Sequence, residues 1–178
     1  GLAGEVAALP DVEVTAPVRD HPVTIADEGR WLVASDLGEM IQITDIGTIT
    51  GDMSAMGPGQ IAVSEDWATE NDAPIGAAVS VEFADGASEE LTVVATFTED
   101  NLMGDLLVDT SVVDPHTATV SDFIVLIGLA DGVGLEDGRA AIESVTSGFG
   151  NPLIETSDEY LEVQGAQLDQ MLGLVYGL

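Results

Sequence analysis

The chain has 178 residues, with 33 Asp or Glu against three Arg and no Lys, so its formal net charge is -30 at pH 7. This charge argues against nucleic acid and anionic lipid headgroups as partners. The absence of cysteine excludes disulfides, thiol catalysis and cysteine metal sites, whereas an apolar content of 46% predicts a folded domain.

The acidic composition has two explanations, and the sequence leaves both open. One is a solvation strategy for high salt or solubility, which the scattered distribution of the acids favours. The other is a surface that binds a cation or a cationic ligand. Strong self-repulsion also predicts that stability rises with salt, because the electrostatic screening length shortens to about 3 Å at 1 M.

The first two predicted elements are a helix and a strand. Apolar residues at helical spacing predict a helix over residues 2–9: Leu2, Val6 and Leu9. Alternating apolar and polar residues predict a strand over 12–16, which we expect His21 and Pro22 to end.

Three further elements are predicted before residue 45. Residues 23–25 and 31–34 have the composition of strands, separated by a turn at 27–29. Asp36 is placed to cap a helix that extends to residue 43. Residues 45–59 are rich in Gly, Asp and Ser, which predicts irregular structure.

Residues 61–97 give the clearest pattern in the chain. A strand is predicted over 61–63, followed by a short helix that Ser64 caps. Strands over 79–83 and 91–97 flank Asp85-Gly86, a strong signal for a hairpin turn. The outer face of this unit is a candidate partner surface: Trp67, Asp85 and Glu89.

The elements after residue 105 are predicted to alternate. A short strand over 106–108 and a turn or short helix ended by Pro115 come first. The apolar run 123–129 predicts a central buried strand, and 135–145 and 153–156 predict a helix and a strand, an order that resembles half of a ferredoxin-like fold.

The last predicted element is a long helix capped by Ser157. Its apolar residues fall near a 3.5-residue repeat: Leu161, Leu168, Met171 and Val175. The helix loses all charge after Asp169 and has no stop signal, so we expect it to continue beyond residue 178.

No motif for catalysis or nucleotide binding is present. His21 and His116 are either a catalytic or metal pair or two surface histidines. The acids of 99–105 do not fit the EF-hand pattern, so weak Ca²⁺ binding near Asp100 and Asp105 competes with a plain acidic loop. Paired carboxylates of a hydrolase remain possible, although sugar sites usually include more aromatic residues.

The order of elements resembles the extracytoplasmic domain of FtsX-like and MacB-like permeases of ABC transporters, actinobacterial members best. The segments that carry the resemblance are ALPDV at 8–12, VTAP at 14–17, IAVS at 61–64 with Trp67-Ala68, Ile75-Gly76, VSVEF at 79–83, Asp85-Gly86, LTVVA at 91–95 and the tail 165–178.

The resemblance implies an α+β fold with two subdomains. A porter-like part would be built from residues 1–56 and 116–178, and a small β-rich part, residues 57–115, would be inserted into it. The resemblance further implies a membrane-attached, extracytoplasmic, non-catalytic domain without a cofactor or metal. Its partners would be the transmembrane helices, a cytoplasmic ATPase subunit and an extracellular protein or peptide.

In that arrangement, the helix at 2–9 and the final helix would be membrane-proximal levers that transmit ATP-driven motion to an exported substrate or partner protein. The alternative is a freestanding secreted acidic protein that binds a cation or a cationic peptide. The sequence does not choose between an exporter and a regulator of cell-wall hydrolases, and it does not give the oligomeric state.

Overall fold

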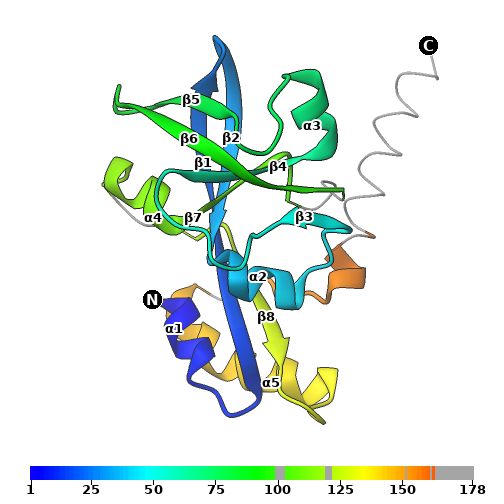
Figure 1. Ribbon diagram of the computed structural model, residues 1–178. Coiled ribbons are helices and arrows are strands. Elements are labelled where there is room, and N and C mark those ends of the chain that lie inside the picture. The colour runs from blue at the N-terminus through cyan, green and yellow to red at the C-terminus, as the bar shows by residue number, and fades with distance from the viewer. Residues whose placement is uncertain (99–102, 119–121, 151, 161, 163–178) are drawn as a thin grey trace, which may run out of the picture.

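The computed structural model describes residues 1–98, 103–118, 122–150, 152–160 and 162. Figure 1 shows an elongated molecule with a β-rich body at one end and a smaller body at the other. The smaller body contains α1 (Leu2–Ala7), α5 (Leu135–Thr146) and β8 (Ile124–Leu129). The architecture is therefore α+β, as predicted.

A single strand, β1 (Val12–Ile25), runs through both bodies. Its first half pairs antiparallel with β8, and its second half, from Arg19 onward, pairs antiparallel with β2 (Glu28–Ser35). The expected break at His21 and Pro22 is wrong. Pro22 pairs only with Trp31 of β2, and the pairing with β5 (Ala78–Phe83) begins at the next residue, so a missing N–H is tolerated as at a sheet edge.

The larger body is a closed barrel. Its strands follow the order β2-β7-β4-β6-β5-β1, and β1 pairs back onto β2, which closes the ring. The strands not yet located are β4 (Gln60–Ser64), β6 (Ser88–Phe97) and β7 (Leu106–Asp109), while β3 (Ile49–Gly51) pairs with β6 outside the ring. Closure gives each of these six strands a partner on both sides along part of its length.

The barrel draws strands from both sides of residue 57. Its β1 and β2 come from the predicted porter-like segment, and β4 to β7 come from the predicted insertion. The pairing of β2 with β7, residues 33–35 with 107–109, joins the two segments directly.

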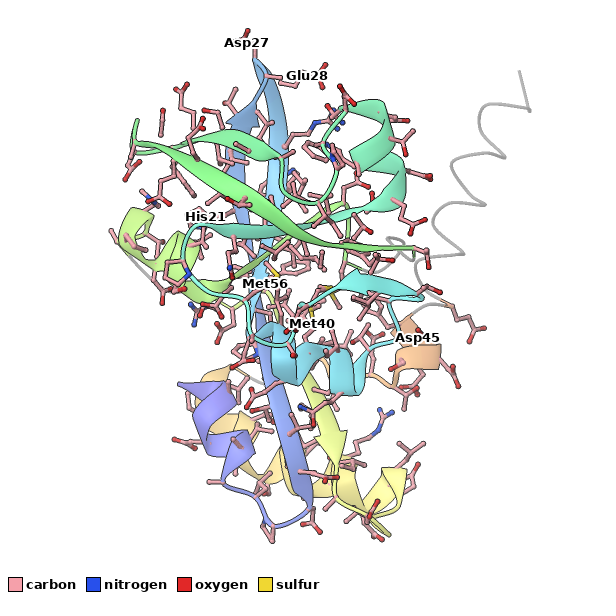
Figure 2. The ribbon with its side chains drawn as sticks, in the orientation of Figure 1. His21, Asp27, Glu28, Met40, Asp45 and Met56 are labelled. Carbon is pink, nitrogen blue, oxygen red and sulfur yellow. The ribbon has the colours of Figure 1, made fainter. Side chains whose placement is uncertain are left out.

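Two hydrophobic clusters hold the fold together. The first fills the barrel and includes Leu32, Val81 and Leu91. The second lies between the sheet and α2 (Leu37–Ile43) and includes Met40 and Phe97. Figure 2 shows Met40 on α2, between the barrel and the smaller body.

The predicted caps at Asp36 and Ser64 and the predicted hairpin are confirmed. The Asp36 carboxylate accepts a bond of 3.2 Å from the Glu39 N–H, and the Ser64 hydroxyl accepts one of 3.1 Å from the Trp67 N–H at the start of α3 (Glu65–Glu70). Gly86 has φ +85°, which favours glycine, and the Asp85 carboxylate accepts from the Ala87 N–H at 2.9 Å.

The prediction that residues 123–129 form a central strand is wrong. Strand β8 lies at the end of the sheet and pairs with β1 alone within the described residues. All six of its residues are half-buried, and the preceding Phe123 is exposed. Helices α2 and α5 cover its faces, since α2 contacts β8 and a Cβ on Gly138 of α5 would overlap Leu129. These helices explain its apolar composition.

Two predictions near the C-terminal end are also corrected. Residues 152–156 form no strand, and Leu153 is exposed. The helical residues 157–160 are capped by Thr156, not by Ser157. The Thr156 hydroxyl accepts from the Glu159 N–H at 3.2 Å, and the Glu159 carboxylate accepts from the Thr156 N–H at 2.7 Å, a capping box.

We expect Gly51→Ala to destabilise the protein by about 2–3 kcal/mol. Gly51 ends β3 with φ +94°, and a Cβ there would overlap the Val94 carbonyl oxygen of the neighbouring strand. Gly59→Ala is the matched control, because Gly59 has φ +73° with open space around it, so its cost is about 1 kcal/mol. Urea unfolding measures both variants, and equal losses would contradict the steric explanation.

Candidate functional site

The residues predicted as a partner surface do not share one environment. Trp67 is only 4% exposed and packs in the barrel core, so it is not part of a surface. Asp85, in the β5–β6 turn, and Glu89, on β6, are partly exposed and lie on the same side of the hairpin, where both bind His116. As a partner surface, Asp85 and Glu89 stay a prediction.

His116 contacts two carboxylates and an aromatic ring. It ends a single 3-10 turn, η1 (Asp114–His116), that follows α4 (Thr110–Val113). Its Nδ1 lies 3.0 Å from an Asp85 carboxylate oxygen, and its Nε2 lies 3.1 Å from a Glu89 carboxylate oxygen. The ring also stacks on Phe83, with centroids 3.8 Å apart and planes 11° apart. His116 is therefore held on one face and at both nitrogens.

The environment of His116 shifts the pKa values of the group. Burial is the largest influence on the His116 pKa and lowers it, but the hydrogen bonds and charges of Asp85 and Glu89 together outweigh burial, so the pKa lies above its usual value. The pKa of Asp85 is lowered, first by the Ala87 N–H and then by His116. Both shifts favour the charged pair.

His21 does not form a catalytic or metal pair with His116. It lies on β1 and meets the edge of Phe83, with centroids 6.4 Å apart. Phe83 thus contacts both imidazoles, stacked on His116 and in a T-shaped arrangement with His21. Among the described residues, no group of three or more His, Asp or Glu could hold a metal ion.

A second ionic cluster lies on Arg19 of β1. The guanidinium donates to Asp114 at 2.7 Å and to Asp122 at 3.0 Å. Asp114 begins η1, and Asp122 precedes β8, so Arg19 and His116 together hold the chain where it passes from the barrel to the smaller body.

The predicted N-terminal lever helix, α1, is packed within the smaller body. Val6 of α1 is buried, and Leu2 and Leu9 are half-buried. Helix α1 contacts both β1 and α5, and Figure 1 shows α1 and α5 side by side at the end opposite the β1–β2 tip. The other predicted lever residues lie outside the described residues: Leu161, Leu168, Met171 and Val175.

Arg139 ties α5 to the start of the C-terminal helical segment. Its guanidinium donates to the Ile154 carbonyl at 3.0 Å and to the Glu159 carboxylate at 2.7 Å. The pKa of Glu159 is lowered, first by the Thr156 N–H and then by Arg139. Helix α5 therefore contacts α1 on the one hand and residues 154–159 on the other.

No other feature of the described residues suggests a site with chemistry. A shallow hollow of about 360 Å³ beside α2 and β3 is lined by four isoleucines, Ile41, Ile43, Ile46 and Ile49, and by Gln42, Thr44, Asp45 and Gly47. Residues 99–102 of the proposed calcium loop lie outside the described residues, and the Asp105 carboxylate accepts from the Ser64 hydroxyl at 2.7 Å.

Sequence comparison and structural comparison differ in what they find. No protein-family profile and no curated protein matches the chain in sequence. In structure, the periplasmic region of MacB from Actinobacillus actinomycetemcomitans matches with a TM-score of 0.67 at 12% identity, over 92% of this chain and 81% of that chain. The chain has the fold of a MacB-like extracytoplasmic domain.

Two further structures share the MacB-like fold. The extracellular domain of the noncanonic ABC-type transporter YknZ from Gram-positive bacteria matches with a TM-score of 0.58 at 10% identity, over 85% of this chain and 83% of that chain. A domain from Porphyromonas gingivalis, named for a permease protein, matches with a TM-score of 0.55 at 14% identity, over 83% of this chain and 75% of that chain. The names of these two structures refer to a permease and to a transporter.

Proposed function

We propose that this chain is the extracytoplasmic domain of an ABC-transporter permease, that it catalyses nothing itself, and that it transmits ATP-driven motion to an exported substrate or a partner protein. The observation that carries the proposal is the MacB-like fold, which extends over 92% of the chain. Within the described residues, no helix is long and apolar enough to cross a membrane. Under the proposal, the transmembrane helices and the ATPase belong to other parts of the transporter.

The contacts of α5 support a role for the smaller body as the input of the motion. Helix α5 packs against α1 and is bonded through Arg139 to residues 154–159. A displacement of either of these segments would therefore be shared through α5, because packed secondary elements shift as bodies rather than deforming continuously. The division into a porter-like subdomain, residues 1–56 and 116–178, and an inserted β-rich subdomain, residues 57–115, is part of this proposal.

Strand β1 supports a continuous mechanical connection to the barrel. Its 14 residues extend for about 45 Å at the usual strand rise, from the smaller body to the β1–β2 tip. Figure 2 shows Asp27 and Glu28 at this tip, at the opposite end of the molecule from α1 and α5. Under the proposal, the tip is the part of the domain that moves most relative to the membrane.

The genomic test of the proposal concerns the reading frame on each side of this segment. We expect apolar segments of about 20 residues close to both ends of it, long enough to span a bilayer. We also expect that the full-length product copurifies with an ATPase subunit. A stop codon directly after residue 178 would contradict the permease proposal and favour a freestanding binding protein.

The transmission of motion is testable in the full-length permease with its ATPase in vesicles. Because the chain has no cysteine, Asp27→Cys gives a single site in this domain for a dye at the barrel tip, read against quenchers on the lipid headgroups. We expect ATP to change the quenching, and Arg139→Ala to reduce that change at least about twofold while ATP hydrolysis continues.

Arg30→Ala is the matched control for Arg139→Ala. Arg30 pairs with Glu28 at 2.6 Å near the barrel tip, so its loss removes an arginine salt bridge without touching α5. We expect this variant to respond to ATP as the wild type does. If quenching does not change while ATP is hydrolysed, the lever mechanism is refuted. If both variants reduce the ATP-dependent change in quenching equally, the role of Arg139 is refuted.

A further inference from the structure

The chain leaves the barrel through η1, and a titratable ring, His116, connects η1 to the β5–β6 hairpin. His116 reaches from η1 to Asp85 in the β5–β6 turn and to Glu89 on β6, across 31 and 27 residues of sequence. Its side chain is 7% exposed and covers one face of Phe83. Any loosening of His116 would uncover that face of Phe83 and free η1 from the hairpin.

The geometry at the ring is satisfied by one protonation state. A neutral imidazole has a single N–H, so it can donate a hydrogen bond to only one of the two carboxylates. Its other ring nitrogen then points a lone pair at an oxygen of the other carboxylate, which is repulsive. An imidazolium has two N–H groups and donates to both Asp85 and Glu89. The two short contacts therefore fit the charged ring.

The other basic side chains nearby, His21 and Arg19, contact other groups and do not pair with Asp85 or Glu89. His21, on β1, meets Phe83 edge-on rather than the carboxylates. Arg19, also on β1, is bonded to Asp114 and Asp122. Within the described residues, the charged groups that act on His116 are thus Asp85 from the turn and Glu89 from β6, and His21 contacts Phe83 instead.

We propose that His116 is a proton-operated latch that fastens η1 to the β5–β6 hairpin when the ring is charged and releases η1 when the ring loses its proton. The latch is independent of the transport proposal, because it rests on contacts within this chain alone. A second fastening, the ion pairs of Arg19 with Asp114 and Asp122, contains no histidine and holds Asp114 at the start of η1. Release is therefore confined to the hairpin side of η1.

The direction of the pH effect follows from the raised pKa of His116. A group with a raised folded-state pKa stabilises fully below its unfolded value of about 6.5, and the stabilisation is lost as pH rises through the folded value. The chain has no Lys and no Cys, so histidine is the side-chain type whose ordinary pKa lies closest to neutral pH.

The test is hydrogen exchange and histidine NMR on the 178-residue chain at constant high salt. The probes are hairpin amides, including the Phe83 N–H bonded to the Ala87 carbonyl. We expect their protection, corrected for intrinsic rates, to fall about tenfold between about pH 5 and about pH 9. We also expect the His116 pKa to lie above that of an unfolded histidine.

The decisive variant is Asp85→Asn with Glu89→Gln, which removes both carboxylates and keeps the side-chain shapes. It should lower the His116 pKa and make hairpin protection independent of pH. Glu70→Gln with Asp72→Asn is the control, since these exposed acids change the net charge equally without approaching His116, and it should behave as the wild type.

Glu89→Gln alone serves if the double variant does not fold, and it should lower the His116 pKa by a smaller amount. Hairpin protection that does not change with pH in the wild type would overturn the latch. So would a His116 pKa that neither the double variant nor Glu89→Gln alters.

Discussion

Lowering the salt concentration from about 2 M to about 0.1 M should reduce the free energy of unfolding by about 5 kcal/mol, which is comparable to the whole stability of many domains. The formal charge is -30, and each of the three arginines is already paired within the chain, with Asp114 and Asp122, with Glu28 and with Glu159. The remaining acids repel one another over a screening length of about 10 Å at 0.1 M. Folding concentrates this charge, so the folded state is the one that salt stabilises.

Urea unfolding at a series of NaCl concentrations measures this effect. Tryptophan fluorescence is a suitable signal because Trp67 is buried and Trp31 is exposed. Sucrose at matched osmolality is the control, since an excluded osmolyte stabilises without screening charge. An unfolding midpoint that is the same at low and high NaCl would show that self-repulsion does not govern the stability.

Replacing Phe97 with Ala should cost about 3–5 kcal/mol, the range for a large aromatic side chain in a core. Phe97 is 0% exposed and packs in the cluster between the sheet and α2. It lies on β6 where this strand pairs with both β3 and β4, so the cavity would lie at a junction of elements that cannot collapse easily. The measurement is urea unfolding in about 2 M NaCl, where self-repulsion is screened.

Phe149→Ala is the matched control for Phe97→Ala. The same atoms are removed from η2 (Ser147–Phe149), where the side chain is 40% exposed, so the loss should stay within about 1 kcal/mol. Equal losses in the two variants would mean that the cluster around Phe97 is not the core that its burial indicates.

The parts of the fold that sequence analysis predicted correctly depend on residues close together in the chain. Ser64 caps the helix that begins at the next residue, and Asp85 and Gly86 make a turn between strands that directly precede and follow them. In both places, short side chains or glycine satisfy a backbone geometry within about four residues. Such local signals can be recognised in the sequence without any knowledge of the tertiary structure.

The corrected predictions are those in which tertiary structure overrides a local pattern. The apolar run of β8 indicates burial of both faces, and sequence cannot distinguish faces covered by helices from a strand flanked by two other strands. Pro22 was expected to end a strand, but it occupies a position with a partner on one side only. Thr156 is β-branched and suits a strand, yet it serves as a helix cap.

The His116 cluster was outside the reach of sequence analysis for a related reason. Its carboxylates come from 31 and 27 residues earlier in the chain, and nothing in the Pro115-His116 segment indicates which of 33 acids would meet the ring. Arg19 and Asp122 are 103 residues apart. Only the closure of the barrel and the return through η1 bring these groups together.

The pairing of β1 with β8 also sets an order of events during synthesis. Val14 pairs with Gly128, so the first half of β1 must wait for more than a hundred later residues before it has a partner. At about 5–20 residues per second, this interval is about 5–20 seconds. A nascent chain that emerges N-terminus first would carry a bare, apolar strand end for that time, and a chaperone or the high charge of the chain itself would have to keep it from pairing with a neighbour.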